Sequence, residues 1–494
     1  MHSKTRYYLA IDFGSQSIRT AIINHLGQFV FCYKHPIAKT ALSNMGESEQ
    51  PAQWYQQQLD NVFQALAHAL SEDKIASEDI VSISVTTIRN TLCFYDQNLD
   101  IIRPIISWQD QRDNEQVPRF NLFWRSLFNL INLFYPINST LKKMQQAAIT
   151  NWLWAKEPKC YEKVSKVSLI SGYLHHYLSG HLVESDASVI GYLPFNFGKR
   201  RWHAKMNWQY QALAFKPNWR IPIVPVGTKI GNLKPEFFHQ LFNRQKPMNK
   251  AQQHLGNKGH RNSASIALIA SASDKACEIL GTGCVLPGQV HISLATAITV
   301  SQLSKRCVGS KAFYPGYPSA QPELFICEAM SKHSMTVFST FIDQNKRQFK
   351  TLFGERSVHE LQKSIEQALL VKNDKALASM SKSQAKLLNQ YNQLAESLVT
   401  ELANAIALLQ TRVKINAKAI YISGGGARST WLLEKLARVC SLPVYVTTAP
   451  ETGLLGVAMI ESVSCGDYAN YVEAARAMAW PYTKIQADGT NNIA

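Results

Sequence analysis

The stretch AIDFGSQSIR, residues 10–19, joins an apolar run to a turn that carries one carboxylate and two hydroxyls. Residues 6–12 have the pattern of a buried strand and residues 18–24 that of a second strand, so the turn predicts a hairpin. The N–H groups and hydroxyls of such a turn are the donors that a polyphosphate needs. Asp12 would repel that phosphate unless a divalent metal such as Mg²⁺ lay between them. Taken alone, a plain hairpin with Asp12 capping its turn is the simpler interpretation.

The composition is that of an ordinary globular protein, with 46% hydrophobic and 18% charged residues. A chain of 494 residues is too long for one core, so two domains are expected. The 52 basic and 35 acidic residues give a net charge of +17. The basic residues are scattered, and no zinc-finger spacing or RNA-binding signature accompanies them, so we expect no nucleic-acid partner. Salt-sensitive binding to arbitrary nucleic acid stays open as an alternative that rests on charge alone.

The nine cysteines form no CxxC pair, and the first apolar stretch reads as a strand and not as a secretory leader. We therefore expect reduced thiols and a cytoplasmic protein. The apolar segment 120–138 is interrupted by Arg125 and by asparagines, well short of the roughly 18 continuous apolar residues of a membrane span. We expect an amphipathic helix that covers a core or a partner, and no membrane partner.

Strand and helix patterns alternate through the first half of the chain. A third strand follows the hairpin at 28–34, helical apolar spacing runs from 49 to 70, and a buried strand follows at 80–87. Further strands are predicted at 91–96 and 103–108, and helices dominate from 112 to 180.

A polar, basic stretch at 243–263 has the composition of a linker or surface insertion. It places a domain boundary near residue 255, which gives an N-terminal domain of residues 1–255 and a C-terminal domain of residues 256–494. A buried strand begins again directly after this stretch.

The second half repeats the pattern of the first. Residues 288–303 have the pattern strand, hydroxyl-bearing turn, strand, as residues 7–24 do, and residues 417–440 have the pattern strand, triple glycine, helix. The similarity indicates an internal duplication, although no long identical repeat accompanies it.

Asp274 lies in IASASDKACEILGTG, residues 269–283, between a strand of small residues and an apparent helix. A carboxylate at that place is either a helix N-cap or a catalytic base. Phosphorylation of an alcohol needs one carboxylate that accepts the proton of the attacking hydroxyl. The sequence at this position leaves both interpretations open.

Two further stretches have the character of ligand-binding turns. Ser293–Thr296, SLAT, is a hydroxyl turn that either holds a γ-phosphate or closes an ordinary hairpin. Residues 424–429, GGGARS, place three glycines between a strand and a helix, where a flat ligand can approach the backbone. Their spacing is not GxGxxG, which disfavours a dinucleotide-binding site of the Rossmann kind, and a tight strand-to-helix turn is the alternative.

In this order the motifs resemble those of the FGGY carbohydrate kinases, within the superfamily of sugar kinases, actin and chaperone ATPases. The resemblance rests on AIDFGSQSIR, ESEQPAQWYQ (47–56), ISVTTIRNTLCFYDQNLDIIRPIISWQDQR (83–112), ASDKACEILGTGC (272–284), SLAT, ISGGGARSTWLLEKLA (422–437) and ETGLLGVAM (451–459). It implies an α/β fold with two RNase H-like domains of the actin-like ATPase kind. Each would have a mixed β-sheet flanked by helices, and the cleft between the domains would hold ATP and Mg²⁺.

The resemblance also implies roles for individual residues. Asp12 corresponds to the metal-associated carboxylate and Asp274 to the general base. The ATP and phosphate contacts would come from Gly14, Ser15, Gln16, Ser17, Thr296, Gly424, Gly425, Gly426, Arg428 and Ser429, with Gly425 and Gly426 nearest the purine or ribose. The substrate contacts would come from Arg89, Asn90, Trp108, Asp110, Asp274 and Lys275. The simpler alternatives are that Trp108 is a core residue and that Asp110 pairs with Arg112.

Two departures from the family pattern concern the phosphate and nucleotide side. Ala295 stands where the second phosphate loop usually has glycine, and its Cβ would crowd the γ-phosphate if the backbone needed a positive φ. Residues 330–395 lack the expected glycine-rich stretch, and FGER at 353–356 lacks its context. The segment 393–409 still fits the helix that precedes the adenosine loop.

We therefore predict an ATP-dependent carbohydrate kinase, xylulose-kinase-like, that phosphorylates a ketose such as a pentulose, or a polyol. A homodimer is compatible with this prediction. The alternative is a catalytically impaired descendant that binds sugar or nucleotide without phosphoryl transfer.

Overall fold

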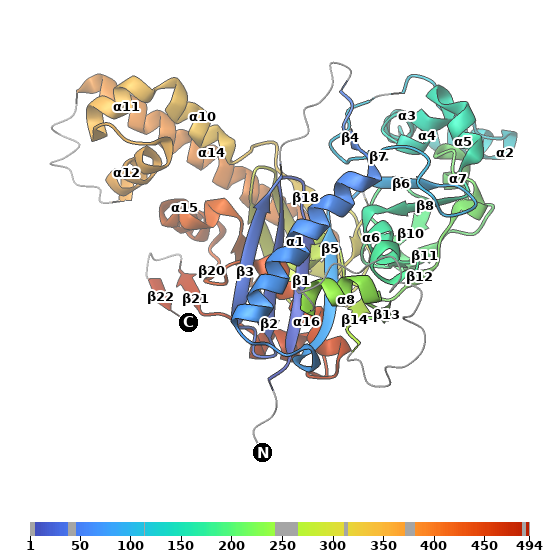
Figure 1. Cartoon of the computed structure of the whole chain (residues 1–494). Helices are drawn as coiled ribbons and strands as arrows, with labels where there is room; N and C mark the ends of the chain where they lie inside the picture. Colours follow the sequence, from blue (N-terminus) through green and yellow to red (C-terminus); the bar gives the residue numbers. More distant parts are fainter. Residues whose placement is uncertain are drawn as a thin grey trace. The chain divides into compact units, whose positions relative to one another are not determined.

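The computed structural model of the chain describes residues 5–37, 46–112, 114–242, 265–310, 315–370, 381–486 and 491–493 (Figure 1). The chain divides into two compact units. The first comprises Met1–Gly281, Tyr317–Glu323 and Glu451–Met478, and the second comprises Thr282–Gly316, Leu324–Pro450 and Ala479–Ala494.

These units differ from the division near residue 255, which falls outside the described residues. The strand and helix at residues 267–281 pair and pack with the first sheet, and the chain returns to the same unit at Glu451–Met478. Asp274 therefore belongs to the first compact unit, although it lies in the second half of the sequence.

The first unit is built on a mixed six-stranded sheet. Its strands, in spatial order, are β13 (Lys229–Asn232), β14 (Ala267–Ile269), β5 (Ile80–Thr87), β1 (Tyr7–Phe13), β2 (Ser17–Asn24) and β3 (Phe29–Pro36). β14, β5 and β1 are parallel, whereas β1, β2 and β3 form an antiparallel meander and β13 is an antiparallel edge. The predicted hairpin and the strands at 28–34 and 80–87 are confirmed.

Side chains alternate along β1 and so separate an apolar face from a polar one. Leu9, Ile11 and Phe13 join the core cluster that includes residues of α1 (Ala52–Glu72). On the other face, Tyr8 donates a hydrogen bond to Asp467. Helices α9 (Asp274–Gly281) and α16 (Thr452–Ser464) lie on this face: α9 packs on β5, and α16 packs on β1 and β5. Asp12 shares the face of Tyr8, so the alternation directs it toward α9 and α16 and away from the apolar core.

A second, smaller sheet of the first unit has the order β4 (Glu49–Gln50), β7 (Ile105–Ile106), β6 (Leu92–Tyr95) and β8 (Lys166–Leu169). Helices α2 (Leu122–Asn132), α3 (Asn138–Gln146), α4 (Ile149–Lys156), α5 (Pro158–Lys163) and α6 (Ile170–Ser179) follow or flank its strands. The predicted helix at 49–70 begins only at Ala52, because residues 49 and 50 pair with β7. The predicted strand at 103–108 is reduced to two residues.

The remaining elements of the first unit are short. They are β9 (Glu184–Ser185), β10 (Phe195–Asn196), β11 (Arg201–Trp202), α7 (Trp208–Ala212), β12 (Ile223–Val224), α8 (Pro235–Phe242), β17 (Tyr317–Pro318) and α17 (Tyr471–Ala477). Within the described ranges, no helix combines the length and apolarity that crossing a bilayer requires.

The sheet of the second unit repeats the topology of the first. Its order is β18 (Phe325–Met330), β16 (Ile298–Ser304), β15 (Gln289–Leu294), β19 (Ala419–Ser423), β20 (Val444–Thr447), β21 (Tyr482–Ile485) and β22 (Asn491–Ile493). β15, β19 and β20 are parallel, β15, β16 and β18 form an antiparallel meander, and β21 is antiparallel to β20. The order β13-β14-β5-β1-β2-β3 thus corresponds strand by strand to β21-β20-β19-β15-β16-β18, which supports the suspected duplication.

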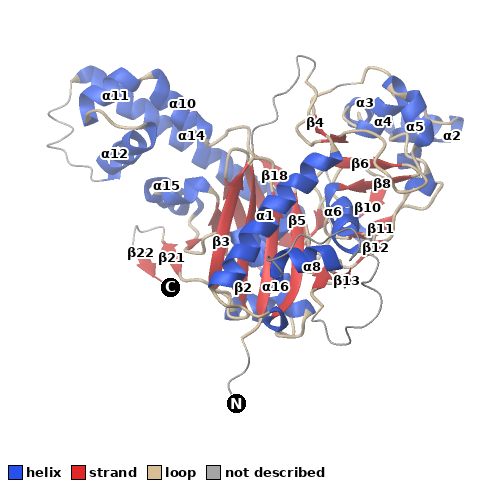
Figure 2. Cartoon of the chain, in the orientation of Figure 1, coloured by secondary structure: helices blue, strands red, loops and turns tan. Residues whose placement is uncertain are grey.

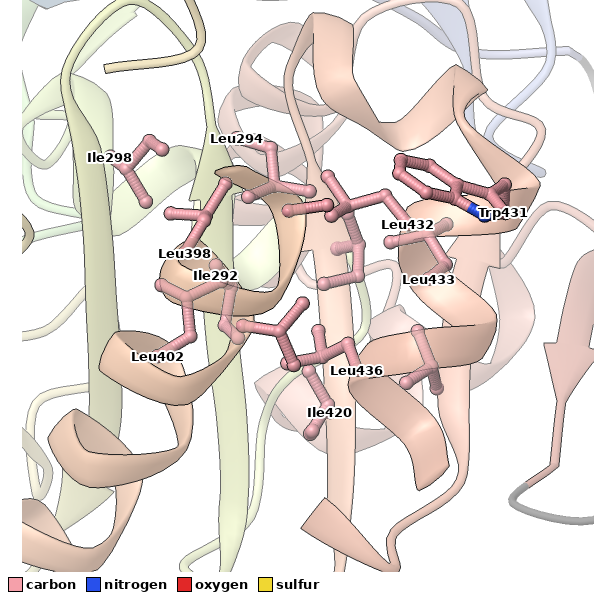
Figure 3. Close-up of a cluster of buried hydrophobic side chains, with 14 of the residues drawn as sticks. Ile292, Leu294, Ile298, Leu398, Leu402, Ile420, Trp431, Leu432, Leu433 and Leu436 are labelled. Carbon is pink, nitrogen blue, oxygen red and sulfur yellow. The ribbon is translucent and has the colours of Figure 1, made fainter. Parts of the chain in front are cut away.

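Helices α14 (Lys382–Val413) and α15 (Thr430–Cys440) pack on the second sheet. Figure 2 shows both helices in blue. Leu398 and Leu402 of α14 and Leu432 and Leu436 of α15 point toward Ile292 of β15 in a closely packed cluster (Figure 3). The predicted helix at 393–409 lies inside α14. Residues 330–395, which depart from the family pattern, include α10 (Thr336–Gln344), α11 (Lys346–Phe353) and α12 (Val358–Leu370).

Candidate active site

The first hairpin turn carries a buried carboxylate. Gly14 N donates to the Ser17 carbonyl at 3.2 Å and closes the turn between β1 and β2. Asp12 stands opposite Arg19 in the register, and Arg19 Nη1 lies 3.1 Å from Asp12 Oδ2. Arg19 Nε also lies 3.3 Å from Oε1 of Glu451. The second carboxylate oxygen, Asp12 Oδ1, is buried and accepts no hydrogen bond from any described residue.

The charges around Asp12 favour a bound cation. Burial raises the pKa of Asp12 to about 7, Asp274 and Glu451 add to the rise, and Arg19 opposes it. A buried carboxyl group with one unpartnered oxygen fits a divalent cation that would replace the proton. Among the described residues, no three His, Cys, Asp or Glu side chains gather as a metal cage. Asp12 is therefore the side chain that we would assign to Mg²⁺, an ion that usually keeps several waters and binds through one or two carboxylates and substrate phosphates.

Gly14, Ser15, Gln16 and Ser17 form the turn itself. Gly14 and Ser15 are partly exposed, Gln16 is exposed and Ser17 is buried. The Gln16 carbonyl accepts a hydrogen bond of 3.0 Å from Ile37 N, which ties the turn to the end of β3. The turn therefore presents backbone and one hydroxyl outward, as a phosphate loop requires, while the Ser17 hydroxyl points inward.

Asp274 is the first residue of α9. The Ser273 carbonyl accepts a hydrogen bond of 2.9 Å from Cys277 N, so Ser273 occupies the N-cap position and Asp274 the first helical position. The side chain of Asp274 is 30% exposed, and its Oδ1 accepts a hydrogen bond of 2.7 Å from Lys275 N. Burial raises the pKa of Asp274, while Arg89 and Lys275 oppose the rise. A partly open carboxyl group with an increased proton affinity suits a general base.

Two cations flank this carboxylate. Arg89 Nε lies 3.7 Å from Asp274 Oδ1, and its guanidinium group lies 5.4 Å from the ring centre of Tyr317. Lys275 Nζ lies 2.6 Å from Oε2 of Glu278. Burial acts to lower the pKa of Lys275, but Glu278 and Asp274 outweigh it and the net shift is upward. Both groups therefore remain charged beside Asp274.

Asn90 lies directly after Arg89 and adopts a left-handed conformation with φ of 52°. Its N–H donates a hydrogen bond of 3.0 Å to the Ile190 carbonyl. A Cβ placed at Gly191 would lie 2.6 Å from Oδ1 of Asn90, so the side chain lies close against that glycine. Asn90 thus fixes the path of the chain after β5.

Trp108 is exposed, whereas Asp110 is engaged with neighbouring residues. Trp108 is 45% exposed, so the interpretation of this ring as a core residue is wrong. Asp110 is held by Arg112, with Oδ2 of Asp110 lying 2.7 Å from Nη2, and it also accepts from Ser48 N at 2.8 Å. The alternative that Asp110 pairs with Arg112 is confirmed. Both oxygens of Asp110 are engaged in shaping the loop.

Thr91 connects the two predicted sugar-binding segments. Its Oγ1 accepts a hydrogen bond of 3.3 Å from Trp108 N and donates one of 3.4 Å to the Arg89 carbonyl. Thr91 is fully buried. The backbone of Trp108 is therefore held to the segment that carries Arg89, whose guanidinium group lies beside Asp274.

The second hairpin turn lies in the second unit, between β15 and β16. Thr296 is exposed and Ala295 is partly buried. Ala295 is not among the residues with positive φ, so the turn places a Cβ there without backbone strain. The penultimate pair of this hairpin is Ser293 and Thr299, two hydroxyl residues.

The glycine loop 424–429 packs on this second hairpin. Gly424 has φ of 83°, and a Cβ at that position would lie 2.7 Å from the carbonyl carbon and oxygen of Leu294. A Cβ at Gly426 would lie 2.7 Å from Leu294 Cβ, whereas one at Gly425 would meet nothing within 4 Å. The backbone of Gly425 therefore faces open space, where a flat ligand can approach, and Gly426 is covered. Arg428 is exposed.

Ser429 ends this loop as the N-cap of α15. Its hydroxyl oxygen accepts a hydrogen bond of 3.3 Å from Leu432 N and donates one of 2.7 Å to Oε2 of Glu366. Glu366 belongs to α12, and its Oε1 accepts a hydrogen bond of 3.1 Å from the Tyr391 hydroxyl. The segment that departs from the family pattern is thus tied to the glycine loop.

Sequence reasoning assigned no role to Arg19, Glu451, Glu278 or Glu366. Arg19 had a detectable signal, because hairpin pairing of β1 with β2 sets it opposite Asp12. Glu451 begins the motif ETGLLGVAM, which marks the return of the chain to the first unit. Glu278 lies within the motif ASDKACEILGTGC, three residues after Lys275, so helical spacing could have predicted this pair. Glu366 belongs to a helix without a recognisable motif, and only the three-dimensional structure brings it to Ser429.

Comparison with known proteins agrees with this arrangement. The model described as FGGY family of carbohydrate kinases, N-terminal domain, matches residues 7–252, and the model of the C-terminal domain of the same family matches residues 372–465. The chain belongs to the FGGY family of carbohydrate kinases. As an FGGY kinase it is a phosphotransferase with a hydroxyl group as acceptor, and ATP is the substrate of this family.

Two relatives of this FGGY kinase align with nearly its whole length. A xylulose kinase of Staphylococcus xylosus is 22% identical, with 98% of this chain and 96% of the relative aligned. An L-fuculokinase of Haemophilus influenzae is 22% identical, with 95% of this chain and 97% of the relative aligned. The crystal structure of a ligand-bound xylulose kinase from Lactobacillus acidophilus has a TM-score of 0.73 at 14% identity, covering 96% of this chain and 92% of that one. That likeness confirms the fold, the two-domain actin-like ATPase architecture.

Proposed function

We propose that this FGGY kinase transfers the γ-phosphate of ATP to a hydroxyl group of a small ketose, such as a pentulose, or of a polyol, with Asp274 as general base. The environment of Asp274 carries the proposal. This carboxylate opens α9, is partly exposed, has a raised pKa and lies between Arg89 and Lys275. It belongs to the same compact unit as the buried carboxylate of Asp12.

The reaction requires one proton transfer and one exchange of bonds at phosphorus. Asp274 accepts the proton of the sugar hydroxyl while that oxygen bonds to the γ-phosphorus, and the bond from the γ-phosphorus to the bridging β–γ oxygen breaks. ADP leaves with the electron pair of that bond. Arg89 keeps Asp274 ionised before the transfer, because a cation at 3.7 Å favours the charged form.

Asp12 would hold Mg²⁺ through its unpartnered Oδ1, and the bound metal would neutralise phosphate charge during the transfer. Arg19 engages Oδ2, which leaves Oδ1 as the atom directed toward the metal. The N–H groups of Ser15 and Gln16 would donate to phosphate oxygens, while that of Gly14 closes the turn.

The nucleotide side of the proposal rests on the second unit. Thr296, at the exposed turn of the second hairpin, would donate to a phosphate oxygen. Gly424, Gly425 and Gly426 would bring the backbone against the purine or ribose, and the open space above Gly425 supports this role most directly. Arg428 is exposed beside this loop and is available to an anionic or planar group. Ser429 would act by holding the loop, since its hydroxyl is engaged with Glu366.

The substrate class rests on chemistry and on the names of relatives. The exposed Trp108 indole offers a flat surface to sugar C–H groups, and Arg89, Asn90 and Lys275 offer hydrogen-bond donors to hydroxyls. The relative named xylulose kinase favours a pentulose as the substrate, whereas the relative named L-fuculokinase leaves other ketoses open as substrates. Asp110 would contribute less to substrate binding, because its carboxylate oxygens are already engaged with Arg112 and Ser48.

The test is a coupled assay of ATP consumption across pentuloses, hexuloses, pentitols and glycerol. Asp274→Asn is the blank, and Asp73→Asn, an exposed carboxylate at the C-terminal cap of α1, is the matched control. We expect turnover on one substrate class with the wild type and with Asp73→Asn, and none with Asp274→Asn. Silence across the panel, with ATP still binding in calorimetry, would overturn the kinase proposal in favour of a binding-only protein.

A further inference from the structure

Helix α2 and the residues that follow it expose an unusual amount of apolar side chain. Their exposure ranges from 57% for Leu130 to 77% for Leu133. We call this surface the α2 crest, and it consists of Leu122, Phe123, Leu130, Leu133, Phe134 and Tyr135. Large contiguous apolar surfaces of this kind mark interaction sites in folded proteins.

The opposite side of α2 already anchors the helix to its own unit. Phe128 is buried, with its ring centre 5.0 Å from that of Phe120 and 5.5 Å from that of Trp208. Asn121 caps the helix by accepting a hydrogen bond of 3.0 Å from Trp124 N. The helix is therefore held in place without the crest, so the apolar side chains of the crest have no role in the core that would explain them.

The chain around the crest is basic and free of acidic residues. Residues 116–156 contain no Asp or Glu, and neither do residues 187–235, which include Trp208 beneath α2. Exposed basic residues in the two segments include Arg119, Arg125, Lys142, Lys143, Lys156, Arg201 and Lys205. The carbohydrate kinase reaction does not account for this concentration of positive charge, nor for the net charge of +17.

We propose that the α2 crest docks on the surface of an anionic lipid bilayer. The leucine and aromatic side chains would enter the boundary between head groups and acyl chains, and the arginines and lysines would contact phosphate groups. Long basic side chains can extend to the head groups while their stems lie along apolar surface. The protein would lie on the bilayer and not cross it, so the proposal replaces the sequence-based expectation of no membrane partner.

A second copy of the chain is the competing occupant, and charge decides against it. The six side chains expose on the order of 800 Å², which matches one side of a standard protein interface, so area alone does not discriminate. A symmetric dimer through the crest would bring two copies of these basic segments together, and like charges across an interface are unfavourable. An anionic bilayer supplies the opposite charge.

The test is sedimentation of the full-length protein with vesicles of phosphatidylcholine alone and with vesicles that also contain phosphatidylserine. We expect binding only to the phosphatidylserine vesicles, weakened by salt. The double variant Phe123→Ser/Phe134→Ser should lower the affinity about tenfold or more, because both rings lose their apolar contact with lipid. Leu26→Ser, at an exposed leucine of the β2–β3 turn, is the matched control and should bind as the wild type does.

Sugar kinase turnover of the double variant serves as the check on folding, because neither phenylalanine belongs to the proposed active site. Equal sedimentation with both vesicle types, or wild-type binding by the double variant, would overturn the proposal. A dimer in sedimentation equilibrium that the double variant abolishes, without vesicle binding by the wild type, would assign the crest to a second copy instead.

Discussion

At the end of β1, Asp12 faces Arg19 across the first hairpin, and at the corresponding place in the second hairpin Ser293 faces Thr299. Both pairs are the penultimate pairs before their turns, and both hairpins belong to sheets with the same strand order. The backbone is thus repeated while the chemistry is not. One copy carries a buried carboxylate paired with a half-buried arginine, and the other carries two buried hydroxyl residues beside closely packed glycines.

The difference teaches that a duplicated fold can divide the work of one reaction. The first unit contains Asp12 and Asp274, the two carboxylates that the proposed reaction needs. In the second unit, the glycine loop packs on the hairpin, and Gly424 leaves no room for a Cβ against Leu294. We therefore expect the loss of a charged side chain in the first hairpin to lower turnover. Added side-chain volume beside the second hairpin should instead raise the KM for ATP and lower stability.

Within the comparison of the two hairpins, the largest effect should come from replacing the residues of the penultimate pairs. Asp12→Asn should lower Mg²⁺-dependent turnover about a hundredfold or more, because the metal would lose its protein ligand. Ser293→Ala, at the corresponding position of the second hairpin, should change turnover by less than about threefold. Steady-state kinetics over a range of Mg²⁺ concentrations measures both, and equal losses in the two variants would break the comparison.

The next effect concerns the glycine loop. Gly424→Ala should raise the KM for ATP about tenfold and lower the free energy of unfolding by about 1–3 kcal/mol, because φ is positive and the Cβ meets the Leu294 carbonyl. Gly425→Ala is the matched variant, with open space around its Cβ, and should unfold like the wild type. Denaturant unfolding and ATP kinetics check the pair. Similar unfolding curves for both variants would contradict the packing argument.

A smaller effect should come from Glu366, which links α12 to the glycine loop. Glu366→Gln weakens the acceptor for the hydroxyls of Ser429 and Tyr391, so the KM for ATP should rise about threefold while the KM for the sugar stays unchanged. Gln367→Glu changes the charge at an exposed position of α12 and serves as the control. A change in the KM for the sugar alone would contradict the assignment of Glu366 to the nucleotide site.

The smallest effect concerns pH. Burial raises the pKa of Asp274 above its ordinary value of 3.8. As the pH is lowered, turnover should therefore begin to fall at a higher pH than it would if the base were an exposed carboxylate. Arg89 opposes the rise, so Arg89→Met should move this acid limb to still higher pH. Profiles of kcat against pH, each scaled to its own plateau, measure the shift. A limb that moves to lower pH would contradict the assignment of Asp274 as the titrating base.

The sequence predicted the parts of the molecule that local pattern controls. The hairpin around Asp12, the strand at 80–87 and the helix within 393–409 follow from apolar periodicity and turn residues, and the structure has them. The two short strands β4 and β7 were not predictable at their observed lengths, because pairing between distant segments sets their ends. The compact units also escaped prediction, since β14 and α9 join the first sheet across a large distance in the chain.

The candidate site was predictable where a motif carries it and not where side chains meet only in space. Asp12, Asp274 and the glycine loop were found from strand ends and glycines. The pairing of Glu366 with Ser429 joins residues far apart in sequence, and neither lies in a pattern that names the other. Ala295 shows the limit of reading a motif literally, because the backbone there does not need the glycine that the family pattern predicts.

The most direct measurement of the central claim is a single-turnover transfer experiment with Asp274→Asn, accompanied by calorimetric titration of ATP. If Asp274 is the base, the rate of phosphoryl transfer to the sugar should fall about a thousandfold while the Kd for ATP stays within about twofold of the wild type. Transfer at a near-normal rate in this variant would contradict the account and move the base to another residue.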